Sequence, residues 1–379
     1  MSDGGAPWAG ARVAIVHDWF QGFHGAERVV DALAEEVLAE AAAVDVFTFH
    51  AAREVLPPRL AGRIVRESRL AGLPGIRQVG HDPGRWRYLL PYMPRFFRAL
   101  PLAGYDLLIA SSHAWALQAS PRASVPYVCY CHTPMRYAWL TEAERERLHG
   151  AQGWALRAAA GRLRRSDRRA AARPDRFVAN STAVRDRIRR FYGRQATVVH
   201  PPVAADDLAP AAERDGFLWV GRLVAYKRPE LAVEVFRGLP QRLTMVGIGP
   251  LEARIRRDLP ANVELRGWIP RAELARLYAT ARGFFWVGEE DFGMSMVEAL
   301  AAGAPVIAPD AGGARDIVRD GLDGILVEEV TPAALRAAVE RAAAASWDPS
   351  RLADRAREFS PERFAARMRE VLRAAMAER

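Results

Sequence analysis

The sequence contains almost no lysine. Of its 54 basic residues only Lys227 is a lysine, and every other one is an arginine. The chain therefore uses arginine wherever a surface cation suffices. A single lysine is expected where a compact ammonium is needed and a planar guanidinium does not fit. The alternative, that Lys227 is a chance survivor among arginines, stays open at this point.

Two further shortages exclude other classes of protein. The two cysteines, Cys129 and Cys131, are one residue apart, a spacing unlike that of zinc pairs or a redox CxxC. It predicts two buried or half-buried thiols on one face of a strand, in a reducing cytosol. No segment approaches 18 consecutive apolar residues, so no membrane span is expected. Residues 1–19 lack the pattern of a signal peptide, and we expect a cytoplasmic protein.

Positive charge is concentrated in one part of the chain. The formal net charge is +9, and residues 151–200 contain thirteen arginines against three aspartates. Such a segment serves nucleic acid, an anionic membrane surface, or solubility alone. No nucleic-acid-binding motif accompanies it, so no nucleic-acid partner is expected. A peripheral position on the inner face of the plasma membrane stays open, because residues 85–100 mix aromatics with arginines. That segment predicts either a core helix with a solvated face or a surface for lipid headgroups.

The order of apolar runs predicts two α/β domains in succession. Residues 11–19 form an apolar strand, a glycine-containing turn follows, and Val29, Val30, Leu33 and Val37 recur at helical spacing. This is the opening of a doubly wound domain. Further strands are expected at 44–49, 106–112, 126–132 and 175–181. After HPPV (200–203) a second series follows, with strands at 216–223, 242–249, 263–268, 283–288 and 304–310. A cleft between two such domains is a usual place for a ligand.

The loop after the strand at 216–223 carries two cations. Arg222 ends that strand and Lys227 follows five residues later, before a helix. Two cations beside a helix N-terminus are suited to a diphosphate group. Taken alone, an arginine and a lysine in a loop are more often solvated.

The segment 289–313, EEDFGMSMVEALAAGAPVIAPDAGG, follows the strand at 283–288. It predicts a loop that carries Glu290, a helix with Glu298 in its second turn, a strand, and a paired-glycine turn. Carboxylates accept paired hydrogen bonds from vicinal hydroxyls of a sugar or a ribose. The bend between Glu290 and Glu298 offers backbone N–H groups to a phosphate. These are the N–H groups of Phe292, Gly293, Met294 and Ser295.

These motifs together resemble the family 4 glycosyltransferases, which are retaining, use nucleotide sugars and have the GT-B architecture. The resemblance covers nearly the whole chain. It rests on HDW…GAERVV (17–30), YCHTPMRYAW (130–139), FVANSTAVRDRI (177–188), HPPV (200–203), VGRLVAYKRPELAVEVF (220–236) and the Glu290–Gly313 block. HDW and CHTPMRY look most like the branch that adds mannose to lipid-linked bacterial oligosaccharides.

The resemblance implies two Rossmann-like domains facing each other across a cleft. We expect an acceptor-side domain at 1–200, a donor domain at 201–355, and a C-terminal helix at 356–379 that crosses back to the first domain.

Two motifs also have a purely structural interpretation. Without the resemblance, a histidine at a strand end such as His132 would more often be structural. NST at 180–182 matches a glycosylation sequon but is expected to cap a helix.

The resemblance also implies a role for each site residue. Arg222 and Lys227 match the pair that holds the donor diphosphate. Glu290 matches the glutamate that contacts the transferred sugar, and Glu298 the one that contacts the ribose.

Two residues of the first domain complete the implied site. Gly25 matches a glycine that approaches the donor phosphates, although the family usually has Gly-Gly where this chain has His24-Gly25. His132 matches a histidine near the sugar and the reaction centre.

The expected reaction is retaining sugar transfer, by same-face attack, without a metal or other cofactor. Arg222 and Lys227 would stabilise the leaving diphosphate, and the chain has no DxD motif. The expected donor is GDP-mannose, and the expected acceptor is a saccharide or a polyprenyl-linked saccharide. The alternatives are a GT-B enzyme that uses a UDP-sugar and a nucleotide-sugar epimerase-like enzyme.

Overall fold

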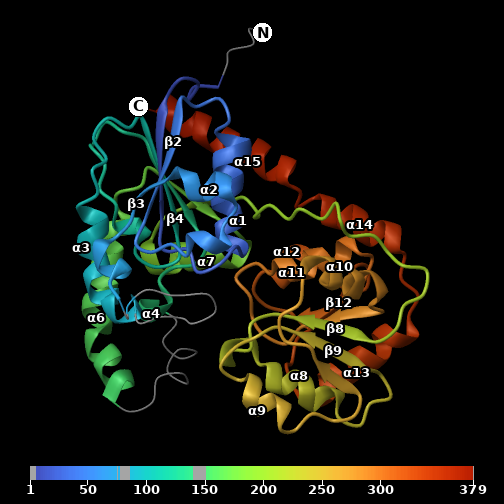
Figure 1. The fold of residues 1–379 in the computed structure, drawn as a ribbon. Helices are drawn as coiled ribbons and strands as arrows, with labels where there is room; N and C mark the ends of the chain where they lie inside the picture. The colour runs from blue at the N-terminus through green and yellow to red at the C-terminus, as the bar shows by residue number, and fades with distance from the viewer. Residues whose placement is uncertain (1–5, 75, 77–85, 140–150, 379) are drawn as a thin grey trace. The chain divides into compact units, whose positions relative to one another are not determined.

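The computed structural model describes residues 6–74, 76, 86–139 and 151–378 (Figure 1). The chain divides into two compact units. The first comprises Met1–Pro202 and Pro361–Arg379, and the second comprises Val203–Ser360. Two doubly wound Rossmann-like units were expected from the sequence, and this fold class is confirmed.

A parallel seven-stranded sheet forms the centre of the first unit. Its strand order is β3-β2-β1-β4-β5-β6-β7. The strands are β1 (Arg12–His17), β2 (Ala43–Thr48), β3 (Ile64–Arg66), β4 (Leu107–Ser112), β5 (Tyr127–Cys131), β6 (Arg176–Ala179) and β7 (Ala196–Val198). The order reverses direction between β1 and β4, so the crevice at the carboxyl ends of these strands is the place where such a fold binds ligands.

Helices cover both faces of this sheet. They are α1 (Gly25–Ala32), α2 (Pro58–Arg63), α3 (Met93–Arg98), α4 (Arg136–Trp139), α6 (Ala151–Ala171), α7 (Thr182–Tyr192) and α15 (Pro361–Ala377). Alternate residues of β1 enter two different cores: Val13 packs with α1 and α15, whereas Ala14 packs with α3. The last helix, α15, thus supplies part of the first unit's core although it follows the second unit in sequence.

The segment 85–100 differs from a single helix. Its described part is a 3₁₀ segment, Trp86–Tyr92, followed by α3. Pro91 and Pro94 explain the break, because proline lacks the N–H that a continuous helix needs.

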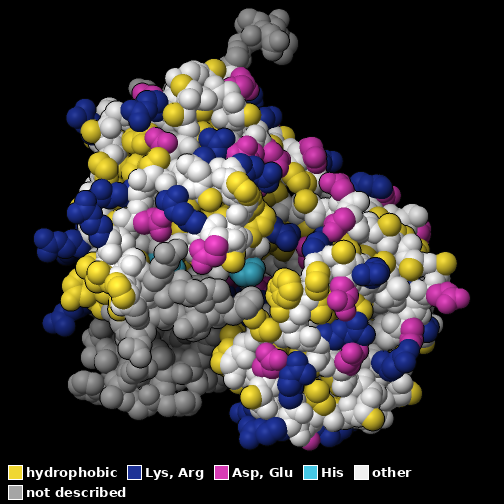
Figure 2. Space-filling model, viewed as in Figure 1, with side chains coloured by type: hydrophobic (Ala, Val, Ile, Leu, Met, Phe, Trp, Pro, Cys, Tyr) yellow, Lys and Arg dark blue, Asp and Glu magenta, His cyan; other side chains and the backbone are white. Residues whose placement is uncertain are grey.

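Charged side chains of both signs are interspersed over the face of the molecule that Figure 2 shows.

The second unit has a parallel six-stranded sheet of order β10-β9-β8-β11-β12-β13. Its strands are β8 (Phe217–Val220), β9 (Leu243–Val246), β10 (Val263–Leu265), β11 (Gly283–Phe285), β12 (Val306–Pro309) and β13 (Gly324–Val327). Its helices are α8 (Pro229–Phe236), α9 (Glu252–Arg256), α10 (Arg271–Thr280), α11 (Met294–Ala301), α12 (Ala314–Ile317), α13 (Pro332–Ala344) and α14 (Pro349–Arg357). Here the order reverses between β8 and β11.

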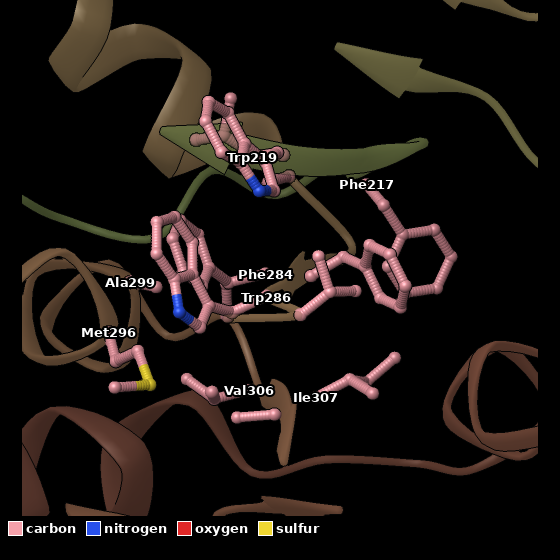
Figure 3. Packing of buried hydrophobic residues seen from close by; sticks show 14 of the residues in the cluster. Phe217, Trp219, Phe284, Trp286, Met296, Ala299, Val306 and Ile307 are labelled. Carbon is pink, nitrogen blue, oxygen red and sulfur yellow. The ribbon is translucent and has the colours of Figure 1, made fainter. Parts of the chain in front are cut away.

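Two stacked indoles lie in the core beneath that reversal. Trp219 of β8 and Trp286, which follows β11, are both fully buried, with ring centroids 5.1 Å apart and planes 14° apart. Figure 3 shows them beside Met296 and Ala299 of α11. These large flat side chains fill this end of the core and support the loops that follow β8 and β11.

Several local predictions are confirmed. Ser181 caps α7, because its Oγ accepts from the Val184 N–H at 3.1 Å. Cys129 and Cys131 are both buried and free. None of the helices that the structure describes is both long and apolar enough to span a bilayer.

Candidate active site

An ion pair bridges the strand reversal of the second sheet. Lys227 lies in the loop after β8, and Glu290 lies in the loop after β11. The Lys227 Nζ is 2.8 Å from the Glu290 Oε1, and each side chain is less than one-fifth exposed. Two residues 63 positions apart in sequence therefore meet at the carboxyl ends of adjacent strands, as the Rossmann-like order requires.

Lys227 is held from three sides. Its Nζ lies 4.8 Å from the centre of the Trp286 ring, within range of a cation–π contact. Burial lowers the pKa of Lys227, but the Glu290 carboxylate and Tyr226 raise it by more, so the net shift is upward. The nearby charge of Arg222 acts to lower the same pKa. The ammonium therefore stays protonated, beside a second cation.

The backbone at Lys227 leaves no room for a side chain at Gly288, in the strand-end segment beside it. A methyl group at Gly288 would lie 2.9 Å from the Lys227 Cα. Immediately after Lys227, Arg228 adopts φ 51°, which makes it the one non-glycine residue with positive φ in the described chain. Such strain persists only where its surroundings fix it, and it is frequent at binding sites.

The paired glycines at 312 and 313 support the acidic loop. The Gly313 N–H donates to the Glu290 carbonyl at 2.9 Å. A methyl group at Gly312 would lie 2.2 Å from that same carbonyl oxygen. The loop, helix, strand and turn of residues 289–313 thus form one unit, in which the final turn fixes the loop that carries Glu290.

The start of α11 faces this loop. Gly293 adopts φ 106°, and no side chain caps the helix. The amides of Met294 and Ser295 open the helix, and the positive end of its dipole suits a phosphate. Phe292 is buried and packs edge-to-face on Phe359 at 5.5 Å, so its backbone, rather than its ring, is the part that a ligand could use.

Glu298 is already engaged within the protein. Its Oε1 accepts from Arg271 at 2.8 Å and its Oε2 accepts from the Tyr278 hydroxyl at 3.0 Å. Arg271 also holds both oxygens of Asp207, at 2.8 Å each. Burial lowers the pKa of Arg271, but Asp207 and Glu298 raise it by more. A ribose that reached Glu298 would therefore meet a carboxylate whose position Arg271 and Tyr278 already fix.

His132 follows β5 at the carboxyl edge of the first sheet, and its partner Ser111 belongs to the neighbouring strand β4. Its ring is nearly buried, and its Nε2 hydrogen-bonds the Ser111 Oγ at 2.7 Å. The same hydroxyl lies 3.1 Å from the His17 Nδ1. Burial, together with the neighbouring rings of His113 and His17, lowers the pKa of His132 well below its ordinary value. His132 is therefore a neutral ring in a fixed orientation.

Asp18 fixes the same edge of the first sheet. It is fully buried, and its carboxylate accepts the backbone N–H groups of the turn after β4, residues 113–116, at 2.5–2.9 Å. Its Oδ2 also lies 3.4 Å from the His113 Nδ1. The sequence analysis did not identify Asp18, His17 or Ser111 as site residues. Their position at the ends of β1 and β4 was the available signal.

Gly25 opens α1, the helix that follows β1. The preceding residue, His24, is the N-cap, and its N–H donates to the Glu27 Oε2 at 3.1 Å. A carboxylate therefore already occupies the first turn of α1, where a donor phosphate was expected to approach. Within the first unit the structure brings Gly25 and His132 to the same end of the sheet. Within the second unit it does the same for Arg222, Lys227, Glu290, residues 292–295 and Glu298.

Two family models match consecutive parts of this chain. Residues 23–207 match the model described as Glycosyltransferase Family 4, and residues 205–359 match the one described as Glycosyl transferases group 1. Together they account for most of the sequence, and they meet close to the division between the two compact units.

Curated relatives match over different lengths. A GDP-mannose-dependent alpha-mannosyltransferase of Mycolicibacterium smegmatis is 44% identical over 115 residues, 29% of each chain. A D-inositol 3-phosphate glycosyltransferase of Nocardiopsis dassonvillei is 27% identical over 350 residues, 79% of this chain and 77% of the relative. The match with the mannosyltransferase thus covers less than a third of that protein.

Solved structures match over almost the full length. A sucrose-phosphate synthase from Thermosynechococcus elongatus has a TM-score of 0.70 at 19% identity, covering 97% of this chain and all of the other. Anabaena HepE in complex with UDP-glucose has a TM-score of 0.69 at 19% identity, covering 96% and 100%. These likenesses show the fold. The chain therefore carries a family 4 glycosyltransferase domain followed by a group 1 glycosyltransferase domain, on the GT-B fold.

Proposed function

We propose that this protein is a retaining glycosyltransferase that moves a sugar from a nucleotide-sugar donor to an acceptor hydroxyl. The observation that carries the proposal is the Lys227–Glu290 pair, which places an ammonium and a carboxylate together at the strand reversal of the group 1 domain. An ammonium suits the donor diphosphate, and a carboxylate suits the hydroxyls of the sugar beside it.

Arg222, Lys227 and the first amides of α11 stabilise the leaving diphosphate. Negative charge grows on its bridging oxygen as the glycosidic bond breaks, and fixed positive groups stabilise that charge without rearranging. Lys227 is suited to this work because Trp286 and Glu290 already fix its position. With protein cations in place, the proposed reaction needs no metal ion.

Glu290 and His132 hold the transferred sugar. The Glu290 carboxylate accepts hydrogen bonds from two vicinal hydroxyls, and its salt bridge to Lys227 fixes its position. His132 is neutral, and its Nε2 is already hydrogen-bonded to the Ser111 Oγ. Its Nδ1 is then the ring atom that hydrogen-bonds a sugar hydroxyl. Glu298, held by Arg271 and Tyr278, accepts from the ribose.

The proposed chemistry retains the anomeric configuration without a covalent intermediate. The acceptor oxygen forms its bond to the anomeric carbon on the face from which the diphosphate departs. The carbon–oxygen bond to the diphosphate breaks through an oxocarbenium-like state. The acceptor proton passes to the departing diphosphate oxygen, so that no separate protein base is required.

We propose GDP-mannose as the donor and a saccharide, free or polyprenyl-linked, as the acceptor. Support for this donor comes from the HDW and CHTPMRY motifs and from three relatives named GDP-mannose-dependent alpha-mannosyltransferase. A UDP-sugar is the competing donor, and the HepE complexes contain UDP or UDP-glucose.

A panel of nucleotide sugars tests both the activity and the donor. Binding to the folded state raises the thermal midpoint by mass action, so GDP-mannose should raise it most. Mass spectrometry of a candidate acceptor should then show the added hexose. Stronger stabilisation by UDP-sugars would overturn the donor assignment. Conversion of the donor to its epimer with no acceptor present would favour the epimerase-like alternative over transfer.

A further inference from the structure

One face of α6 presents a row of cations. Arg162, Arg165 and Arg169 follow one another at helical spacing and are exposed, and Arg173 continues the row just beyond the helix. Residues spaced three and four apart share one face of a helix. Asp167 is directed elsewhere, because it is buried and hydrogen-bonded to Trp139 and Tyr192. The acidic residue of this helix therefore does not neutralise the row.

This face forms one wall of a cavity in the first unit. The cavity has a volume of about 550 Å³. It is lined by Arg98, Gln118, Arg162, Arg165, Ser166, Arg169 and Arg173. Five of these seven residues are arginines and none is acidic, so the cavity is strongly electropositive. We call it the arginine pocket.

Buried polar groups organise the arginine pocket. Gln118 is 1% exposed, and its Oε1 accepts from the Arg98 Nε at 3.0 Å and Nη2 at 2.8 Å. The Arg98 Nη2 also donates to the Ser166 Oγ at 3.1 Å, and the Arg173 Nη1 donates to the Gln118 carbonyl at 2.8 Å. Neutral acceptors thus fix two guanidinium groups at the pocket, whereas α6 positions the other three.

The pairing of these arginines differs from that of two arginines elsewhere in the unit's sequence, Arg59 and Arg63. Arg59 and Arg63 each bind a carboxylate, those of Asp31 and Glu35. Among the described residues, none of the five pocket arginines has a carboxylate partner. Like charges in one cavity repel each other, and an anionic ligand would remove that repulsion.

We propose that the arginine pocket binds a phosphate or diphosphate group. Guanidinium groups match phosphate oxygens in paired, parallel hydrogen bonds, which favours this anion class. The volume exceeds that of one phosphate and leaves room for a second phosphate or an ester substituent. The group belongs either to a membrane lipid or to a soluble phosphate compound. The proposal does not depend on the donor site, which lies in the other unit.

Pyrophosphate binding, measured by isothermal titration calorimetry, tests the soluble source. Every protein compared carries Lys227→Ala, so that the proposed donor site contributes little. The pocket variant adds Arg165→Gln and Arg169→Gln. Its matched control adds Arg66→Gln and Arg189→Gln, which remove the same charge from exposed positions that do not line the pocket. Thermal midpoints of all three confirm folding.

Losing two charged donors should weaken pyrophosphate binding by about tenfold or more in the pocket variant. The control should bind like the parent protein. Co-sedimentation tests the lipid source, with vesicles of phosphatidylcholine alone or mixed with phosphatidylglycerol. Selective loss of binding to the mixed vesicles in the pocket variant identifies a lipid headgroup. Selective loss for pyrophosphate alone identifies a soluble phosphate. Equal behaviour of pocket variant and control toward both probes, or no binding of either probe by the parent, would overturn the proposal.

Discussion

The Lys227 Nζ lies 2.8 Å from the Glu290 Oε1, with the Trp286 ring 4.8 Å away. The one lysine of the chain is thus placed in a confined position between a carboxylate and an indole. A guanidinium is larger and planar, and would displace one of these neighbours. This geometry gives a physical reason for a lysine at this position.

Gly312 gives a direct test of how the paired-glycine turn supports Glu290. A methyl group at this residue would lie 2.2 Å from the Glu290 carbonyl oxygen, and φ is 60°. We expect Gly312→Ala to displace the acidic loop and to lower kcat at least about tenfold, since a misplacement of about 1 Å can cost far more.

Gly321 is the matched control, because its φ is 73° and nothing lies within 4 Å of the added methyl group. Both variants carry the backbone strain of about 1 kcal/mol, measured by denaturant unfolding, but only Gly312→Ala should lose activity. Equal kcat values would show that the turn does not position Glu290.

Sequence patterns identified the central strands and the edge strand β10, but missed the other three edge strands of the two sheets. β3, β7 and β13 were not predicted. Of these, β3 and β7 are three-residue edge strands with largely half-buried or exposed side chains, so their sequences carry little periodic signal. The engagement of Glu298 by Arg271 and Tyr278 was equally invisible, because these contacts join residues 27 and 20 positions apart.

Other site residues followed from strand-end positions. Placing Lys227 and Glu290 after two parallel strands was enough to bring them to one edge of the sheet. It did not reveal that they pair with each other. Asp18 was missed because its partners are backbone N–H groups of residues 113–116, which no side-chain pattern encodes.

Ser111 should position His132. Its hydroxyl hydrogen-bonds the His132 Nε2 at 2.7 Å. We expect Ser111→Ala to lower kcat by about tenfold, because the ring loses its fixed orientation, and to shift the acid limb of the pH–rate profile. Ser112→Ala is the control, since Ser112 is also buried but its Oγ accepts from the Leu117 N–H. An unchanged kcat and pH profile in Ser111→Ala would exclude this positioning role.

The histidine pair should make stability depend on pH. Burial, with His113, lowers the pKa of His17 to about 3, and the pKa of His132 is also lowered. Below pH about 6.5 the unfolded chain binds protons that the folded chain does not, so stability falls with decreasing pH, by up to about 1.4 kcal/mol per pH unit for each histidine. Burial raises the pKa of Asp167 to about 6, which acts in the opposite direction between pH 4 and 6. The free energy of unfolding, measured with denaturant at several pH values, should depend less steeply on pH in His17→Gln than in wild type. An identical pH dependence in the two proteins would contradict the assignment.

Turnover should not depend on a divalent metal. The proposed diphosphate site already contains the cations Arg222 and Lys227, and the α11 N-terminus adds a third positive group. We expect the initial rate with EDTA to match the rate with added Mg²⁺. A strict requirement for Mg²⁺, reversible on adding it back, would contradict this assignment of charge stabilisation to the protein.

Lys227 itself gives the sharpest prediction. If it neutralises charge that develops as the diphosphate leaves, Lys227→Ala should lower kcat by roughly 10²–10³, about 3–4 kcal/mol, by analogy with the loss of one preorganised donor. That variant also leaves Glu290 without its ion-pair partner, so some stability should be lost. Lys227→Arg keeps the charge and separates the two effects. Its thermal midpoint should stay close to that of wild type, whereas its kcat at saturating donor should remain clearly reduced, because the guanidinium does not fit between Glu290 and Trp286. Near-wild-type turnover in Lys227→Arg would mean that any cation suffices there, and that the single lysine is a chance survivor.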